Sequence, residues 1–174
     1  AAKMINARSE TVLQKPSFKA PFRKRRCIIP MDGYYEWKMQ STHEAGAYKQ
    51  PYYFSMEDDG PMAVAGIWEH WLGADGSDVE TCSIMTVASN DLVSLVHHRM
   101  PVILDQAHFQ NWLYGSTNEA LKLLRPYYGE RQMRYHPVSR LVSNNRNEGE
   151  GLIEPIDLDS DPNSTEFKPQ MSLF

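Results

Sequence analysis

Glu36 is the first side chain of this sequence whose surroundings suggest chemistry, because it is a carboxylate within the aromatic segment Asp32–Lys38. If the segment is a strand, Glu36 and Lys38 share one face and Tyr35 and Trp37 the other. Burial among aromatic rings would raise the pKa of the carboxyl toward the range in which a general acid/base works near neutral pH. An ion pair with Lys38 or an arginine at a sheet edge is the structural alternative.

His97 and His98 are the second candidates, and Arg99 follows them directly. Neighbouring side chains of an extended chain point to opposite sides, so we expect one imidazole at most to face a given site. A metal ion needs its ligands on one side, so the pair does not predict a metal site. One imidazole with Arg99 nearby could act as an acid/base or hydrogen-bond donor where anions bind. A purely structural histidine is the alternative.

Asn6 and Arg8 form a third candidate, in the segment Met4–Glu10. Residues two apart in an extended segment share a face, so an amide and a guanidinium could reach one ligand. The guanidinium presents a planar fork of donors that suits phosphate. Helix capping and a salt bridge explain the same residues equally well.

The densest charge of the sequence lies in residues 15–26, which hold six cations and no acid, interleaved with Phe18 and Phe22. Cations neutralise phosphates and aromatic faces stack on unpaired bases, so this basic stretch is typical of a surface that binds a polyanion. A solvated basic face is the alternative. The six cations are Lys15, Lys19, Arg23, Lys24, Arg25 and Arg26.

Length and composition narrow the classes of protein. The chain has 174 residues, 41% of them hydrophobic and 23% charged, which is typical of one soluble globular domain. The apolar runs are too short to cross a membrane and the first residues lack the features of a secretory signal, so we expect a cytoplasmic protein. We expect Cys27 and Cys82 to be reduced core thiols, and neither a metal nor an organic cofactor to be bound.

The elements that must position these residues are strands first and helices later, without regular alternation of the two. This order predicts an α+β fold, a mixed but mostly antiparallel sheet rolled into a barrel-like core with short flanking helices. Residues 116–119 form a capping box that opens one of the helices. We expect one domain in residues 1–156 and an acidic, flexible tail in 157–174. The expected strands are Arg26–Ile29, Gly33–Lys38, Tyr52–Met56, Met62–Trp71, Glu80–Ala88 and Met133–Tyr135.

Taken together, the motifs resemble the SRAP family, the SOS-response-associated peptidases, whose animal members are abasic-site processing proteins. The resemblance covers roughly residues 4–156, and the motifs stand in the order of the family. They are Ile5–Thr11, Arg26–Trp37, Ala65–Trp68, His97–Pro101 and His136–Ser139 with Asn144.

The resemblance implies a protein that recognises abasic sites in single-stranded DNA and crosslinks to them. In the family, the α-amine of an N-terminal cysteine condenses with the aldehyde of the opened sugar, and the thiol closes a thiazolidine ring. By motif position, Glu36 corresponds to the acid/base that opens the sugar and His97 to the residue that assists imine formation and reversal. Asn6 corresponds to the residue that orients the amine and Arg8 to a phosphate contact. AP-lyase and self-processing peptidase activities are implied as well.

The sequence departs from the family at its beginning. It starts with Ala1, and its first cysteine is Cys27, an internal thiol without a free α-amine. We therefore expect the leading segment of the family, with the nucleophilic cysteine, to be missing from this sequence. We expect DNA to contact the basic stretch and Arg99, and we expect a monomer, associated with the nucleoid if the source is bacterial. A noncovalent single-stranded DNA-binding module and a peptidase acting on other proteins are the alternatives.

Overall fold

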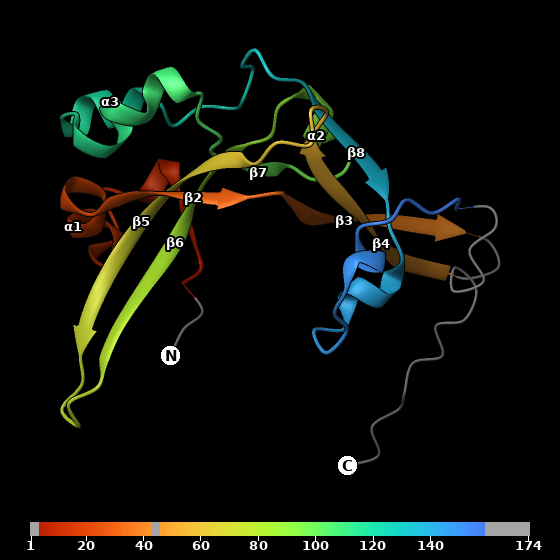
Figure 1. Ribbon diagram of the computed structural model, residues 1–174, viewed down its shortest axis with the longest axis horizontal. Coiled ribbons are helices and arrows are strands. Elements are labelled where there is room, and N and C mark those ends of the chain that lie inside the picture. Colours follow the sequence, from red (N-terminus) through yellow and green to blue (C-terminus); the bar gives the residue numbers. More distant parts are fainter. Residues whose placement is uncertain (1–3, 43–45, 159–174) are drawn as a thin grey trace.

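The computed structural model describes residues 4–42 and 46–158 of the chain (Figure 1). The strands are β1 (Asn6–Arg8), β2 (Arg26–Met31), β3 (Gly33–Thr42), β4 (Gly46–Met56), β5 (Met62–Leu72), β6 (Asp78–Ala88), β7 (Arg99–Pro101) and β8 (Met133–Pro137). The helices are α1 (Pro16–Lys24), α2 (Asp91–Ser94), α3 (Phe109–Tyr114) and α4 (Thr117–Lys122), with short 3-10 turns η1 (Ser9–Thr11), η2 (Gln106–His108), η3 (Arg140–Ser143) and η4 (Glu150–Leu152). Every expected strand is confirmed, and each is longer than expected.

Sheet A contains five strands, in the order β1-β6-β5-β2 with β7 also paired to β6. The β1–β6 pair is parallel and the others are antiparallel. The chain from β7 onward fits between the diverging ends of β5 and β6, since the Val102 carbonyl accepts from Ala65 N at 2.8 Å and Val102 N donates to the Met85 carbonyl at 2.9 Å. This insertion places the segment before β7 beside β6.

Sheet B is antiparallel, in the order β3-β4-β8. The chain passes from β2 to β3 through Asp32, and Gly33 opens β3. A Cβ atom at Gly33 would collide with the Phe54 carbonyl and the Tyr53 ring, so only glycine lets the strands approach here. The change of direction makes β3 pair with β4 instead of extending sheet A.

The expected barrel-like closure is not found. Among the described residues, the strands form two open sheets, and each sheet ends in edge strands. The two sheets are joined where the chain passes from β2 to β3 through Asp32. The α+β class and the mixed, mostly antiparallel pairing are as predicted. Closure fails because β2 and β3, which are nearly continuous in sequence, belong to different sheets.

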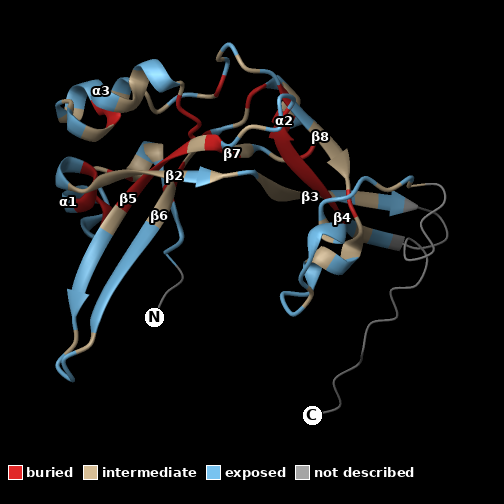
Figure 2. Ribbon diagram, viewed as in Figure 1, coloured by how far each residue is buried: buried red, intermediate tan, exposed pale blue. Residues whose placement is uncertain are grey.

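The hydrophobic core is one cluster that runs from α1 and α3 across the middle of sheet A to β4, and the far ends of the strands are exposed (Figure 2). Phe54 of β4, Met85 of β6 and Trp112 of α3 are completely buried. The Trp112 indole donates to the Cys27 carbonyl at 2.7 Å, which attaches α3 to β2. The sheet that carries Glu36 therefore packs on the same core as the strands that carry Asn6 and Arg8.

Helix α1 covers part of the basic stretch, as predicted, and Pro16 occupies its first turn. Phe18 and Phe22 lie four residues apart on the inner face of the helix and are 6% and 0% exposed. The expectation that these rings could stack on unpaired bases is therefore wrong, because both rings are part of the core.

The capping box is confirmed: the Ser116 hydroxyl accepts from Glu119 N, and the Glu119 carboxylate accepts from Ser116 N. No helix within 4–42 and 46–158 is long and apolar enough to cross a membrane. Of the expected acidic tail, residues 159–174 lie outside the described residues.

Candidate active site

Glu36 and His97 form an ion pair that connects sheet B with the segment leading into β7. Glu36 lies in the middle of β3, opposite Tyr52 of β4, and His97 lies between α2 and β7. The Glu36 Oε2 and His97 Nδ1 atoms are 3.4 Å apart, and the two side chains are 23% and 31% exposed. Two residues that the sequence predicted separately are thus adjacent, partly buried and still accessible to solvent.

Burial controls the acidity of Glu36. Loss of water around the carboxyl raises its pKa, and the charge of His97 and the backbone N–H of Trp37 oppose this shift only in part. The neighbouring Tyr34 hydroxyl is buried without a partner among the described residues, and burial, together with the charge of Glu36, raises its pKa also. A carboxyl with a raised pKa can both donate and accept a proton near neutrality, which suits a general acid/base.

The His97 Nδ1 atom has three polar neighbours. It lies 3.4 Å from Glu36 Oε2, 3.2 Å from the Arg99 carbonyl oxygen and 3.3 Å from the Arg99 backbone nitrogen. When protonated, Nδ1 can donate to Glu36 or to the carbonyl; when unprotonated, it can accept from the Arg99 N–H. The imidazole can therefore gain or lose this proton without losing its place.

The expectation that His97 and His98 point to opposite sides is wrong. Their ring centroids are 4.4 Å apart with a 47° angle between the planes. The chain turns before β7 and is not extended at these residues, so the alternation of a strand does not apply. His98 is exposed and His97 is the partner of Glu36.

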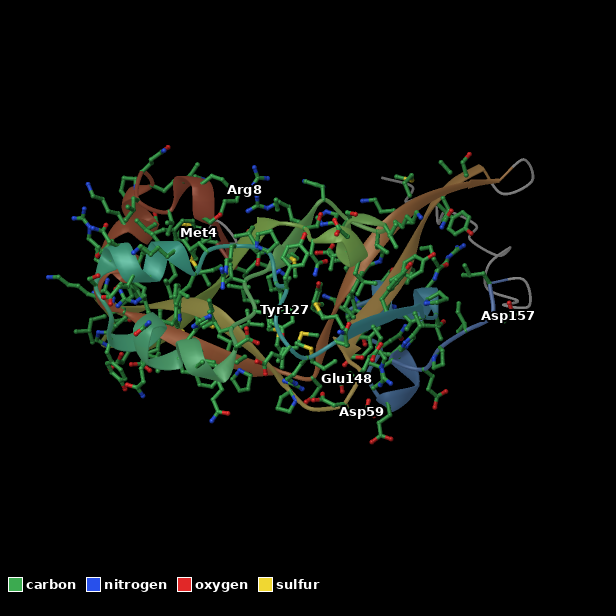
Figure 3. All side chains as sticks on the ribbon, turned by 90° about the horizontal axis from the view of Figure 1, so that it is seen from above. Met4, Arg8, Asp59, Tyr127, Glu148 and Asp157 are labelled. Carbon is green, nitrogen blue, oxygen red and sulfur yellow. The ribbon has the colours of Figure 1, made fainter. Side chains whose placement is uncertain are left out.

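Asn6 and Arg8 lie on one face of β1, which pairs with β6 at Asn6–Ile84 and Arg8–Thr86. Both side chains are exposed. In Figure 3, Arg8 lies between α1 and the sheet formed by β3, β4 and β8. An amide and a guanidinium are thus presented together on the exposed face of β1.

Arg99 is engaged within the protein. Its Nη1 and Nη2 atoms donate to the two Glu10 carboxylate oxygens at 2.5 and 3.1 Å, and Nη2 also donates to the Thr86 carbonyl and hydroxyl oxygens at 2.7 and 3.1 Å. The hydrogen bonds from Arg99 lower the pKa of Glu10 to about 2. Arg99 therefore differs from Arg8, because a carboxylate already faces its guanidinium.

The cations of the basic stretch fall into two groups. Lys15, Lys19, Arg23 and Lys24 are exposed. Arg25 instead forms an ion pair with Glu69 at 2.6 Å, and Arg26 donates to the carbonyl oxygens of Phe22, Trp112 and Gly115. Four of the six predicted cations thus face solvent, and two hold α1 and α3 to the strands. Figures 1 and 3 place α1 at the end of the molecule away from β3 and β4.

The two cysteines differ from expectation in one respect. Cys27 is half-buried, and burial, followed by the charge of Cys82, raises the pKa of its thiol. Cys82 is exposed and not a core thiol, because it lies on the part of β6 that extends beyond the core. The raised pKa of Cys27 is the opposite of what an internal nucleophile would need.

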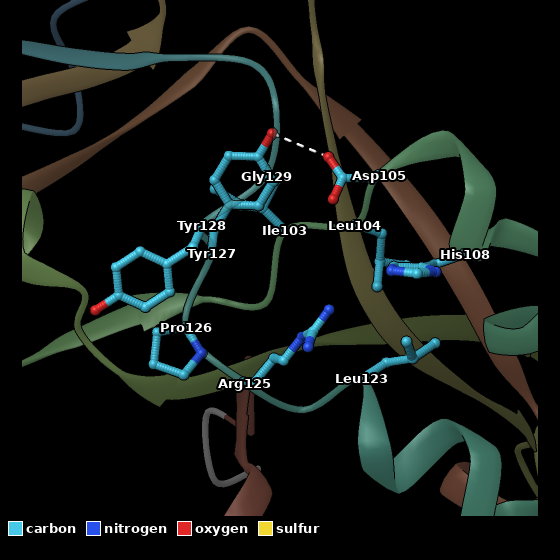
Figure 4. A pocket seen from close by; sticks show the side chains of 10 residues that line it. All are labelled: Ile103, Leu104, Asp105, His108, Leu123, Arg125, Pro126, Tyr127, Tyr128 and Gly129. Atoms are coloured by element: carbon cyan, nitrogen blue, oxygen red, sulfur yellow. Dashed lines mark hydrogen bonds between the residues drawn. The ribbon is translucent and has the colours of Figure 1, made fainter.

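A cavity of about 160 Å³ lies apart from this site, beneath the segment that follows α4 (Figure 4). The Tyr127 hydroxyl donates to Asp105 at 3.1 Å on its wall, and burial with this hydrogen bond raises the pKa of Tyr127 to about 12. His108 and Arg125 also line it, whereas Glu36 and His97 do not. Within the described residues, no group of three His, Cys, Asp or Glu side chains is placed to hold a metal ion.

Sequence reasoning missed Glu10 as part of the site. The residue lies in the same motif as Asn6 and Arg8, but its partner Arg99 is 89 positions away. The sequence did contain a local signal, because Glu10 follows Arg8 by two residues in the motif that holds the candidate ligand groups. That signal did not identify Arg99 as the partner of Glu10.

The chain matches the family described as SOS response associated peptidase (SRAP) over residues 1–145. It is 38% identical over 155 residues to the abasic site processing protein YoqW of Bacillus subtilis (strain 168), a match that covers 87% of this chain and 67% of the relative. It is 36% identical over 180 residues to the abasic site processing protein HMCES of Gallus gallus, covering 90% of this chain and 51% of the relative.

A solved structure of similar fold is the crystal structure of a protein from Bacteroides thetaiotaomicron, with a TM-score of 0.76 and 34% sequence identity. That match covers 87% of this chain and 65% of the other. The chain thus spans between half and two thirds of the length of the relatives it matches. Agreement in motifs, in overall sequence and in fold shows that the chain belongs to the SRAP family of abasic site processing proteins.

Proposed function

We propose that this protein recognises abasic sites in single-stranded DNA and becomes covalently attached to them. The observation that carries the proposal is the Glu36–His97 pair, in which a carboxyl of raised pKa lies 3.4 Å from an imidazole nitrogen. By resemblance to the family, the nucleophile is the α-amine of an N-terminal cysteine, which residues 1–174 do not provide.

Glu36 has the properties needed for the first step. An abasic sugar is mostly a closed hemiacetal, and opening it removes a proton from the C1′ hydroxyl while the ring oxygen gains one. A carboxyl that can both accept and donate a proton near neutral pH serves each half of this exchange. The aldehyde released at C1′ is the electrophile for the next step.

His97 supports the steps that follow. The α-amine adds to the aldehyde carbon, and the carbinolamine loses its hydroxyl as water to give an imine. The hydroxyl leaves with a proton that an imidazolium can donate. The cysteine sulfur then adds to the imine carbon while the imine nitrogen gains a proton, which closes the thiazolidine. The sum is aldehyde plus aminothiol giving thiazolidine and water, with no oxidation or reduction.

DNA recognition is assigned to the exposed cations. Arg8 contacts a phosphate near the reacting sugar, and Asn6 on the same face of β1 orients the amine. Lys15, just before α1, and Lys19, Arg23 and Lys24 on α1 neutralise phosphates farther along the strand. Arg25, Arg26 and Arg99 contribute less, because their guanidinium groups already bind acceptors of the protein. Elimination at the sugar (AP-lyase activity) and self-processing that exposes the terminal amine use the same acid/base pair.

The test is a denaturing intact-mass measurement of the natural protein after incubation with a short single-stranded oligonucleotide that holds one abasic site. The undamaged oligonucleotide is the control for the DNA, and Glu57→Gln, an exposed acid after β4, is the matched control for Glu36→Gln. We expect an adduct on the abasic strand alone. A protein whose mass exceeds 20.0 kDa by a leading segment and which forms no adduct would overturn the covalent function.

A noncovalent single-stranded DNA-binding module is the second candidate, favoured by the exposed cations of α1. It lacks the aromatic half of its argument, since Phe18 and Phe22 are buried. Under this alternative, Glu36→Gln leaves the function, which is the binding of single-stranded DNA, unchanged. A peptidase acting on other proteins has no observation in its favour among the described residues.

A further inference from the structure

We infer that Glu10 is a positioning residue for this site: it holds Arg99 in place, and Arg99 in turn fixes the turn that sets His97 against Glu36. The inference rests on the proposed function for its effect on the reaction, but its structural part can be measured without it. Glu10 itself touches neither Glu36 nor His97 in any contact found among the described residues.

The Arg99 guanidinium connects segments that lie far apart in the sequence. It bridges three elements, because it starts from β7, crosses β6 at Thr86 and ends on Glu10 of η1. The two Glu10 oxygens accept from two different nitrogens, at 2.5 and 3.1 Å. A bidentate arginine–carboxylate pair fixes orientation as well as distance.

The Arg99 guanidinium is a largely buried cation that needs a counter-charge. The Arg99 side chain is only 17% exposed, and its Nε atom is buried without a partner in the described part of the chain. A cation in such a place needs a counter-charge, and Glu10 is the carboxylate that contacts it. A glutamine at position 10 keeps one acceptor oxygen but places an NH2 donor opposite the second guanidinium nitrogen and removes the counter-charge, so the bidentate pair is lost.

The backbone of Arg99 contacts the His97 imidazole directly. The His97 Nδ1 atom lies 3.3 Å from the backbone nitrogen and 3.2 Å from the carbonyl oxygen of Arg99, and its third polar neighbour is Glu36. A displacement of the Arg99 backbone therefore moves two of the three groups that define the imidazole position. Because η1 directly follows β1, the same ion pair also holds the strand of Asn6 and Arg8 to β7.

Glu10→Gln is the test, and the chain offers a matched control in Asp58→Asn. Asp58 also forms a bidentate pair, with Arg131 Nε at 2.8 Å and Nη2 at 2.5 Å, and its pKa is also lowered to about 2, but it lies in the turn after β4. We expect similar small changes of thermal stability in both variants. Only Glu10→Gln is expected to slow adduct formation at saturating DNA by about 10-fold, less than the roughly 100-fold that a 1 Å misplacement can cost, with DNA affinity within about twofold.

Two further measurements separate positioning from general damage. The imidazole ¹⁵N resonances of His97 should shift in Glu10→Gln and not in Asp58→Asn. Adding Glu10→Gln to Arg99→Gln should change the rate by less than about twofold, because the interaction is already lost.

Each outcome of these measurements either supports or overturns the positioning role of Glu10. An unchanged rate and unchanged His97 resonances in Glu10→Gln would overturn the inference, and so would an equal loss of rate in Asp58→Asn. Shifted His97 resonances in a protein whose wild type forms no adduct would retain the positioning role and reject the proposed function.

Discussion

The two regions of the molecule that the sequence associated with DNA, helix α1 and the Glu36–His97 pair, use charge in opposite ways. Lys15, just before α1, and three cations on α1 face solvent, and the aromatic residues between them are buried. At the pair, the charged groups are partly buried and contact each other, and the aromatic residues form their surroundings. Exposed charge in water provides affinity that salt weakens, whereas a partly buried charge has an altered pKa and can take part in chemistry.

The strongest test of this comparison is Glu36→Gln in the adduct assay, where we expect the largest effect. The amide keeps the shape but cannot exchange a proton, so we expect the rate of adduct formation to fall by about 100-fold to 10,000-fold, the range typical of a lost acid/base. DNA affinity measured by fluorescence anisotropy should stay within about threefold. If affinity and rate fell together, the pair would be a binding element like α1. Glu57→Gln should leave both unchanged.

Phe22→Ala tests whether the aromatic residues of α1 belong to the core. The ring is completely buried and lies 5.9 Å from the Trp112 ring, so we expect a loss of about 3–5 kcal/mol in the free energy of unfolding. Urea denaturation measures it, with Tyr128→Ala, which removes an exposed ring, as the control. A stable variant that lost only DNA affinity would return Phe22 to the surface.

Lys19→Gln combined with Arg23→Gln sharpens the comparison on the side of α1. Removing two exposed cations should lower the slope of log Kd against log salt concentration by about 1.4 on single-stranded DNA and weaken binding several-fold at low salt. Titrations at three salt concentrations provide the slope, and Lys122→Gln on α4 is the control. An unchanged slope would mean that DNA does not pass over α1.

The smallest effect concerns pH and stability. The folded-state pKa of Glu36 is raised above its unfolded value, so the fold holds this proton more tightly than the unfolded chain does. Stability is therefore lost as the pH rises from the unfolded pKa, 4.5, through the folded one. We expect Glu36→Gln to melt roughly 2–4 °C above wild type at pH 7.5, as about 1 kcal/mol does in a chain of this size, and the difference to vanish near pH 4. A constant difference across this range would contradict the burial of the carboxyl.

Local patterns predicted local structure well. The strands follow from runs of β-branched and aromatic residues between turn residues, and the Ser116 capping box is a four-residue signal. The face of β3 that carries Glu36 follows from alternation alone. The four-residue spacing of Phe18 and Phe22 also indicated an inner helix face, but the cations around them favoured a surface interpretation.

What the sequence could not predict depends on distant residues. The partner of Arg99 lies 89 positions away, and the division of β2 and β3 between two sheets depends on the close approach at Gly33. His97 and His98 lie in a turn whose shape comes from the packing of α2 and β7. The candidate residues were therefore identifiable, whereas their pairing was not.

The parallel pairing of β1 with β6 has a consequence for how the protein folds during synthesis. Residues 6–8 pair with residues 84–86, so Asn6 and Arg8 leave the ribosome early but have no strand beside them until β6 follows. Closing so long a loop is entropically costly and slow. His97 and Arg99 emerge later still, and only then can η1 be fixed by the Glu10–Arg99 pair. Asn6 and Arg8 of a nascent chain therefore cannot be held in place until the chain has been made at least as far as Arg99.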